Sequence, residues 1–289
     1  MDLLLGRLRD AGLAAESAHV ATGGTVAVAG MATLRDGSRV FAKTLRGPGS
    51  DLFEIEAEGL RALRETGGAV TPDVLAVTSD LLVLQPLRPR RDGEERFWED
   101  LAHKVAALHT TTAGDRFGWH RDGWLGHLRQ DNAWDEDGYS FFARHRVLRW
   151  LGEPPVEAAF DRGDRQALER LCAALPELVP PRPPVLTHGD LWSGNILSDH
   201  AGAPALVDPA VSYNWAEVDL SMLWCTPRPP ASDRFFAVYA ETAPMTDGWQ
   251  DRMPLFHLRE LLATIAHGHD DWGAAETVRK IAGPFARRR

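Results

Sequence analysis

One segment, Val185–Leu197 (V-L-T-H-G-D-L-W-S-G-N-I-L), constrains the fold of this chain more than any other. An apolar run leads into a polar loop that holds Asp190 and, five residues later, Asn195, and the chain then becomes apolar again. A second short apolar run ends at Asp208, thirteen residues after Asn195. Short β-like runs bounded by polar residues predict strands that carry loops, with these three side chains presented near the strand ends.

Two carboxylates and an amide at this spacing are typical of phosphoryl transfer. Asp190 can orient and deprotonate an attacking hydroxyl, while Asn195 and Asp208 are suited to hold the Mg²⁺ that bridges the phosphates. Asp190 or Asn195 alone would more often be a turn residue, but the joint pattern favours catalysis. His188 would either order the loop through backbone hydrogen bonds or take a direct part in the chemistry.

The first ~85 residues have the element order of a nucleotide-binding lobe, namely three strands, a helix and two more strands. An Asp-Gly turn between two apolar runs indicates a hairpin, and Gly67-Gly68 ends the helix that follows it. The predicted elements are an amphipathic helix over residues 2–18, strands near Ala18–Thr22, at Val26–Leu34, Arg39–Leu45, Val74–Val77 and Asp80–Leu84, and a helix at Asp51–Thr66.

The segment Gln85–Gly93 (Q-P-L-R-P-R-R-D-G) is a break in composition, after which the pattern becomes helical. Predicted helices follow at Phe97–Thr110, Ser140–Leu151, Asp164–Leu175, Glu217–Trp224, Ser232–Glu241 and Met253–Ala266. We therefore predict an α+β, two-lobed architecture that resembles the protein-kinase fold. Residues 1–86 would form a small antiparallel β-sheet lobe with one main helix, and residues 87–289 a larger, mostly helical lobe that binds the substrate.

Lys43 ends the predicted hairpin strand V-F-A-K, from which its ammonium would reach the α- and β-phosphates of ATP. A lysine in this role needs a helix carboxylate to orient it, and Glu54, Glu56 and Glu58 are the candidates. The stretch Gly23-Gly24-Thr25 lies where a loop should cover the phosphates with its backbone N–H groups, although such a pair is often only a hairpin turn.

The base of the nucleotide is expected at the predicted hinge. Pro86 has no N–H to donate, so the carbonyl of Gln85 and the N–H of Leu87 are the expected partners of adenine. Val28, Ala42 and Leu84 would form apolar walls around the base.

The same segments resemble the fructosamine kinase (ketosamine-3-kinase) family, which is related to aminoglycoside and choline kinases. The matching motifs are H-G-D-L-W-S-G-N (His188–Asn195), V-D-P-A…E-V-D-L (Val207–Leu220), F-F-A-R-H-R (Phe141–Arg146), F-G-W (Phe117–Trp119) and F-x-x-E-A-x-G-L-x-A-L (Phe53–Leu63). The resemblance implies an ATP- and Mg²⁺-dependent kinase that phosphorylates the 3-hydroxyl of a ketosamine, whose unstable product then releases the amine. It also favours Glu56 as the partner of Lys43.

The acceptor would be a free ketosamine or a glycated amine or protein. Trp192 and Trp215 would contact it, with His267, His269 and Trp272 as further walls, although Trp192 could instead pack within the loop. Asp219 would cap or anchor a helix. The alternatives are a kinase of the same fold that acts on an aminoglycoside or a choline-like alcohol, and a non-catalytic pseudokinase, which retention of the catalytic set disfavours.

Net charge and composition exclude several classes of binding partner and location. The formal net charge of −9 argues against nucleic acid and anionic membranes. The early charges argue against a signal peptide, and no apolar run reaches the ~18 residues of a membrane span. Cys172 and Cys225 form neither a metal spacing nor a disulfide framework. We therefore expect a cytoplasmic monomer.

Overall fold

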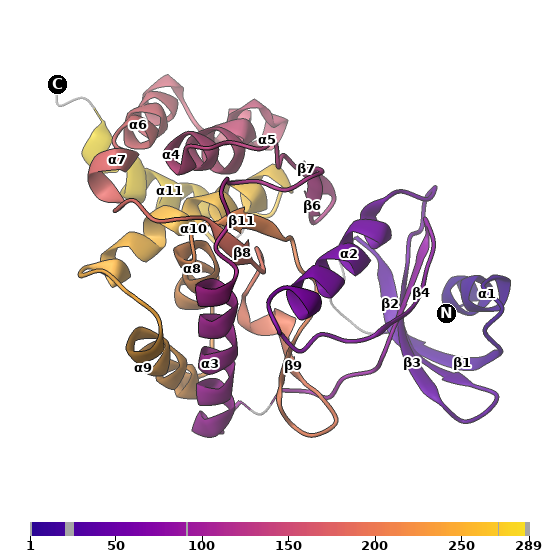
Figure 1. Cartoon of the computed structure of the whole chain (residues 1–289). Helices are drawn as coiled ribbons and strands as arrows, with labels where there is room; N and C mark the ends of the chain where they lie inside the picture. The colour runs from indigo at the N-terminus through magenta and orange to yellow at the C-terminus, as the bar shows by residue number, and fades with distance from the viewer. Residues whose placement is uncertain (1, 21–25, 91, 271, 287–289) are drawn as a thin grey trace. The chain divides into compact units, whose positions relative to one another are not determined.

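The computed structural model describes residues 2–20, 26–90, 92–270 and 272–286 (Figure 1). Gly23, Gly24 and Thr25, predicted to cover the phosphates, lie outside the described residues. The chain divides into two compact units, and neither is one continuous stretch. The first comprises Met1–Ala107, Gly194–Ala210 and Pro229–Tyr239, and the second comprises Leu108–Ser193, Val211–Arg228 and Ala240–Arg289.

This division differs from the single boundary after residue 86 that the sequence predicts. The hairpin of β9 (Ile196–Ser198) and β10 (Pro204–Leu206) belongs to the first unit although it comes late in the chain. Its backbone explains why, because Leu206 N–H donates to Val70 C=O at 2.8 Å and Ser198 exchanges two backbone hydrogen bonds with Arg88. Such long-range backbone pairing is invisible to a reading of local composition.

The first unit is built on an antiparallel five-stranded sheet with the strand order β1-β2-β3-β5-β4. Its strands are β1 (Ala15–Val20), β2 (Val28–Leu34), β3 (Arg39–Thr44), β4 (Val74–Val77) and β5 (Leu81–Leu84). The Asp-Gly turn between β2 and β3 was predicted correctly, and Gly37 adopts φ +82°, which a glycine accommodates without strain.

The two faces of this sheet pack against different helices because side chains alternate along each strand. One face, with Val40 and Ala42 of β3, packs against Leu4 and Leu8 of α1 (Asp2–Asp10). The other face packs against α2 (Leu52–Glu65) through residues that include Phe53 and Leu60. Figure 1 shows α1 and α2 on either side of the sheet.

The predicted helix over residues 2–18 is too long. Helix α1 ends at Asp10, and Gly12 follows with φ +80°, a left-handed conformation that ends helices. The chain then enters β1 at Ala15, whose residues pair with β2. Apolar spacing alone did not reveal this stop, because Leu13 continues the helical pattern past the glycine.

Helices dominate the second unit, as predicted. The long helix α3 (Glu95–Thr111) runs from the first unit into it, and so does α9 (Asp233–Thr242). Helices α8 (Glu217–Cys225) and α10 (Trp249–Ala266) pack on each other within it. Its other elements are β6 (Gly123–Leu125), β7 (Leu128–Gln130), α4 (Gly138–Phe141), η1 (Phe142–Val147), η2 (Leu148–Gly152), α5 (Pro154–Ala159), α6 (Arg162–Ala173), α7 (Leu175–Leu178), β8 (Val185–Thr187), β11 (Ser212–Asn214) and α11 (Ala274–Ala282).

Three helices of this unit were not predicted: α5, α7 and α11. The first two are short and carry a proline in the first turn, where the missing N–H has no helical partner to lose. Cys172 is a buried free thiol. Among the described residues, no helix is long and apolar enough to cross a membrane.

Gly118, in the F-G-W motif, offers a test of this fold. It adopts φ +116°, and a Cβ at this position would lie 2.6 Å from Asn132 O and 2.9 Å from Ala133 O. We expect Gly118→Ala to lower the free energy of unfolding by more than about 1 kcal/mol, because the strained backbone and the close oxygens both oppose a methyl group. Denaturant unfolding measures this, with Gly152→Ala as control.

The control, Gly152→Ala, makes the same substitution at a glycine whose Cβ would meet no close atom. No atom lies within 4 Å of a Cβ at Gly152, and its φ is not positive. A change of less than about 0.5 kcal/mol is expected there, the range usual for surface substitutions. Equal stabilities for the two variants would contradict the tight approach at Gly118.

Candidate active site

A buried ion pair lies at the centre of the first unit. Lys43, on β3, donates from Nζ to Glu56 Oε1 of α2 at 2.7 Å, and their side chains are 10% and 11% exposed. Lys43 also forms an ion pair with Asp208, which follows β10. Of the three carboxylates considered on this helix, Glu56 is therefore the one that pairs with Lys43, while Glu54 is exposed. Helical periodicity explains the choice, since Glu56 lies on the buried face of α2.

The charges in this cluster depend on one another. Burial favours the neutral form of Lys43, but the negative charges of Asp208 and Glu56 outweigh it and raise the pKa of the ammonium. Burial, together with the negative charge of Asp208, raises the pKa of Glu56 above its ordinary value, and the charge of Lys43 opposes this shift. The ammonium of Lys43 therefore offsets part of the cost of burying the Glu56 carboxylate.

Asp208 has an unusual backbone. It adopts φ +55°, a left-handed conformation, and is the sole non-glycine residue to do so in the described part of the chain. Its side chain is 46% exposed, and the preceding N–H, of Val207, donates to Asn195 C=O at 3.1 Å. Such backbone conformations persist where surrounding structure enforces them, often at functional sites. The β9–β10 hairpin thus holds Asn195 and Asp208 at its base.

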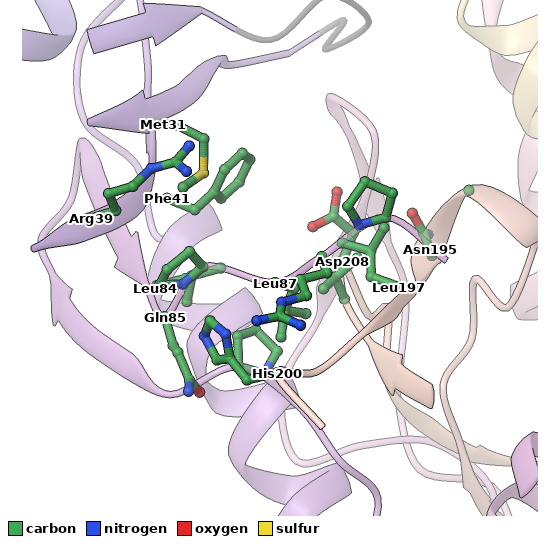
Figure 2. Close-up of a pocket in the computed structure, with 16 residues that line it drawn as sticks. Met31, Arg39, Phe41, Leu84, Gln85, Leu87, Asn195, Leu197, His200 and Asp208 are labelled. Carbon is green, nitrogen blue, oxygen red and sulfur yellow. The ribbon is translucent and has the colours of Figure 1, made fainter. Parts of the chain in front are cut away.

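Asn195 and Asp208 both line a cavity of about 1080 Å³ that lies entirely within the first unit (Figure 2). Most of its lining is apolar, and polar and charged side chains complete it. The apolar lining residues are Met31, Phe41, Pro72, Leu84, Pro86, Leu87, Pro89, Leu197 and Val207, and the others are Arg39, Gln85, Arg88, Gly194, Asn195, His200 and Asp208. A flat aromatic base with a charged tail fits a cavity with this distribution.

The predicted walls of the base site were only partly right. Leu84 lines the cavity, but Ala42 faces the opposite side of the sheet and packs in the core with α1, and Phe41 lines the cavity in its place. Val28 is buried and is not among the lining residues. Alternation along β3 accounts for this, because Phe41 and Lys43 share a face and Ala42 cannot join them.

The predicted hinge residues Gln85 and Leu87 both line the cavity. The backbone of Gln85 is held by its N–H, which donates to Asp73 C=O at 2.8 Å. Its side chain also accepts from the N–H of Asp73 at 3.3 Å. These contacts hold the segment after β5 beside the cavity.

In the second unit, one buried carboxylate holds the loop that carries Asp190. Asp219 of α8 accepts backbone N–H groups of His188 at 2.7 Å and Gly189 at 2.8 Å, and it contacts Nε2 of His109 at 3.2 Å. Asp219 was predicted to cap or anchor a helix, and it anchors this loop instead. His109, at the end of α3, was not predicted, because nothing local to it signals a partner 110 residues away.

The pKa of Asp219 shows how firmly the carboxylate is held. Burial alone would raise it, but the hydrogen bond and charge of His109, together with the N–H of Gly189, lower it below the usual value. Gly189 adopts φ +80°, which lets two successive N–H groups point at the same carboxylate.

His188 supports the loop from inside. Its side chain is fully buried, and its Nδ1 accepts the backbone N–H of Asp190 at 3.2 Å. This position fits the first of the two predicted roles, ordering of the loop. Asp190 itself is half-buried, and the loop continues directly into Asn195.

The two tryptophans predicted to contact the substrate differ sharply. Trp192 is 42% exposed, next to Leu191 in the Asp190 loop. Trp215 is 1% exposed, and its ring packs against Phe117 at 5.5 Å and Phe256 at 5.8 Å between centroids. The prediction for Trp215 was wrong, because an aromatic side chain in the core of the unit has no surface to offer a substrate. His267 contacts His127, and Trp272 is 58% exposed.

A second buried charge lies in the second unit, within the F-F-A-R-H-R motif. The guanidinium of Arg146, on the π-helical turn η1, donates to Asn132 Oδ1 at 2.7 Å and Ser212 Oγ at 3.1 Å. His145 contacts Asp131 at 2.6 Å. π-Helical turns are frequent at functional sites, and this one ties the β7 segment to β11.

The sequence profile of the fructosamine kinase family matches residues 4–279. The chain belongs to the fructosamine kinase family. A candidate ketoamine kinase of Enterococcus faecium is 34% identical over 231 residues, which cover 77% of this chain and 79% of that protein. The chloroplastic protein-ribulosamine 3-kinase of Oryza sativa subsp. japonica is 30% identical over 243 residues, which cover 78% of this chain and 67% of that protein.

Solved structures agree with this assignment. A candidate fructosamine-3-kinase of Thermobifida fusca has a TM-score of 0.85 at 29% identity, covering 96% of this chain and 98% of that one. The choline kinase of Streptococcus pneumoniae shares the fold, with a TM-score of 0.64 at 16% identity. The match covers 99% of this chain and 98% of the choline kinase. The predicted α+β, protein-kinase-like fold is thus confirmed, and this fructosamine kinase family member is an ATP-dependent small-molecule kinase.

A substitution at Asp219 tests whether its carboxylate holds the loop that carries Asp190. We expect Asp219→Asn to lower the free energy of unfolding by about 2–4 kcal/mol at pH 7, because it removes a buried charge that His109 and two backbone N–H groups satisfy. The folded-state pKa of Asp219 is lowered, so its contribution is present at neutral pH and is lost as the pH falls below about 4.

The measurement is denaturant unfolding at pH 7 and pH 3, with the exposed Asp247→Asn as control. The difference between wild type and Asp219→Asn should shrink at the lower pH, while the control stays within about 0.5 kcal/mol of wild type. A difference that grows on acidification would rule out the anchoring role.

Proposed function

We propose that this chain is a ketosamine 3-kinase, which transfers the γ-phosphate of ATP to the 3-hydroxyl of a sugar attached to an amine. The observation that carries the proposal is the match to the fructosamine kinase family over residues 4–279, together with the Lys43–Glu56–Asp208 cluster beside the cavity. The 3-phosphate that forms is unstable and releases the amine, so the reaction would remove the sugar from a glycated amine.

In this proposal the cavity of the first unit holds ATP. The apolar middle, with Phe41 and Leu84, takes the adenine, whose edge would meet the carbonyl of Gln85 and the N–H of Leu87. Lys43, oriented by Glu56, would contact the α- and β-phosphates. The buried cluster supports this role, because an ammonium held between two carboxylates is placed before the nucleotide arrives.

The residues present fit a magnesium ion. Asn195 and Asp208 supply an amide oxygen and a half-exposed carboxylate at the same cavity, and these hard oxygen donors suit Mg²⁺. When bound, the ion would neutralise the negative charge that develops on the phosphates during transfer. The left-handed backbone of Asp208 keeps its carboxylate at the base of the hairpin for that purpose.

The loop of the second unit would serve the acceptor. Asp190 accepts the proton of the 3-hydroxyl as that oxygen attacks, and its backbone is held by His188 and, through the preceding N–H groups, by Asp219. The exposed ring of Trp192 would stack on the sugar or on the amine substituent. His188 then acts by positioning the loop, since its imidazole is buried.

Substrate identity is tested with a panel of acceptors. With ATP and Mg²⁺ we expect turnover of a ribulosamine, an erythrulosamine or a fructosamine of one common amine, with phosphate on the 3-hydroxyl by ³¹P NMR and later release of free amine. An aminoglycoside and choline serve as controls for the same fold, and we expect no turnover of either. Turnover of one of these controls without any ketosamine would refute the proposed substrate.

The role of Asp190 is tested by Asp190→Asn. The amide cannot accept a proton, so we expect kcat for the ketosamine to fall by about 10²- to 10⁴-fold, while the KM for ATP changes less than about two-fold. Steady-state kinetics measure this, with Asp247→Asn as an exposed control that should match wild type. Wild-type turnover in Asp190→Asn would show that another group accepts the proton.

A further inference from the structure

Three basic side chains line the nucleotide cavity: Arg39, Arg88 and His200. They come from β3, from the segment after β5 and from the turn between β9 and β10, and all three are exposed. Figure 2 shows Arg39 at the end of the cavity opposite Asn195 and Asp208. We call Arg39, Arg88 and His200 the basic rim.

The geometry of β3 explains why the rim and the catalytic lysine serve one cavity. Arg39, Phe41 and Lys43 alternate with residues that face the α1 core, so all three project from the same side of the sheet. Four residues of extended strand separate Arg39 from Lys43, about 13 Å along the strand. The strand therefore presents the guanidinium of Arg39 and the ring of Phe41 to the cavity, and Lys43 lies further along the same face.

The charge of the rim is not neutralised by its neighbours. In the part of the chain that the structure describes, the guanidinium groups of Arg39 and Arg88 form no ion pair or hydrogen bond. Asp73, which precedes β4, pairs with Arg64 instead. The sole acid that lines the cavity, Asp208, pairs with Lys43.

The positive charge of the basic rim is opposite in sign to the net charge of the whole chain. The formal net charge is −9, which repels a polyanion such as ATP at long range. Unpaired guanidinium groups at the mouth of a cavity with low-dielectric walls reverse that field locally, because such walls concentrate the electrostatic potential. A local field of this kind affects binding of a charged ligand and leaves a neutral ligand of the same shape unaffected.

We propose that the basic rim is a charge-selective entrance to the nucleotide cavity, whose positive electrostatic field favours binding of the negatively charged polyphosphate without direct contact. The inference rests on the proposed function only in taking an adenine nucleotide as the occupant. It assigns Arg39 and Arg88 a part in nucleotide affinity that is separate from base contacts and from phosphoryl transfer.

The test is the double variant Arg39→Met/Arg88→Met, which keeps long apolar stems and removes both charges. Binding of adenosine, AMP, ADP and ATP is measured by calorimetry without Mg²⁺, so that ligand charge rises along the series. For charges roughly 10 Å apart, we expect the Kd of ATP to rise about three-fold at 0.15 M ionic strength and about ten-fold or more at 0.02 M. The Kd of adenosine should not change.

Two further variants make the result specific. Arg35→Met/Arg61→Met removes two exposed arginines that do not line the cavity, so it matches the change in net charge and should bind ATP within about two-fold of wild type. Arg39→Lys/Arg88→Lys keeps both charges and should also bind ATP like wild type.

The proposal is overturned if adenosine and ATP lose affinity by the same factor, which would mean that the arginines contact the base. It is equally overturned if the control pair weakens ATP binding as much as the rim pair does. Binding is measured without an acceptor, so a failure to phosphorylate ketosamines would refute the proposed function and leave this test valid.

Discussion

The first unit depends on one buried ammonium. Lys43 joins β3 to Glu56 of α2, thirteen residues later, and to Asp208 at the base of the β9–β10 hairpin, 165 residues later. A buried charge without a partner is strongly destabilising, so the sheet, the helix and the hairpin must adopt compatible positions together. The residues that would handle phosphates and metal are thereby fixed by the same interaction that assembles the unit.

The second unit is also organised around a buried charge, which here is negative. Asp219 is a buried carboxylate, and its partners are His109 and the backbone of His188 and Gly189. Loops that carry function are usually mobile, but this one is held from beneath by charge-assisted hydrogen bonds. Asp190 therefore projects from a backbone that is already ordered, and both units bury a charge at the base of a functional loop.

In the proposed function, strand β3 would separate nucleotide binding from phosphoryl transfer. Arg39 and Phe41 line the cavity, and Lys43, which follows them on the same face of the strand, would contact the phosphates. A β-strand produces this separation without any special backbone geometry, because every second side chain faces the same side at a regular spacing.

The sequence by itself determined the spacing of Asp190, Asn195 and Asp208 and the element order of the first unit, because these signals are local. It also implied that Phe41 shares a face with Lys43, although Ala42 was chosen as a wall. Only the tertiary structure decided that Trp215 is core, that Asp219 holds the Asp190 loop with His109, and that Arg39, Arg88 and His200 share one cavity. Those contacts join residues far apart in the chain, so neither periodicity nor composition reports them.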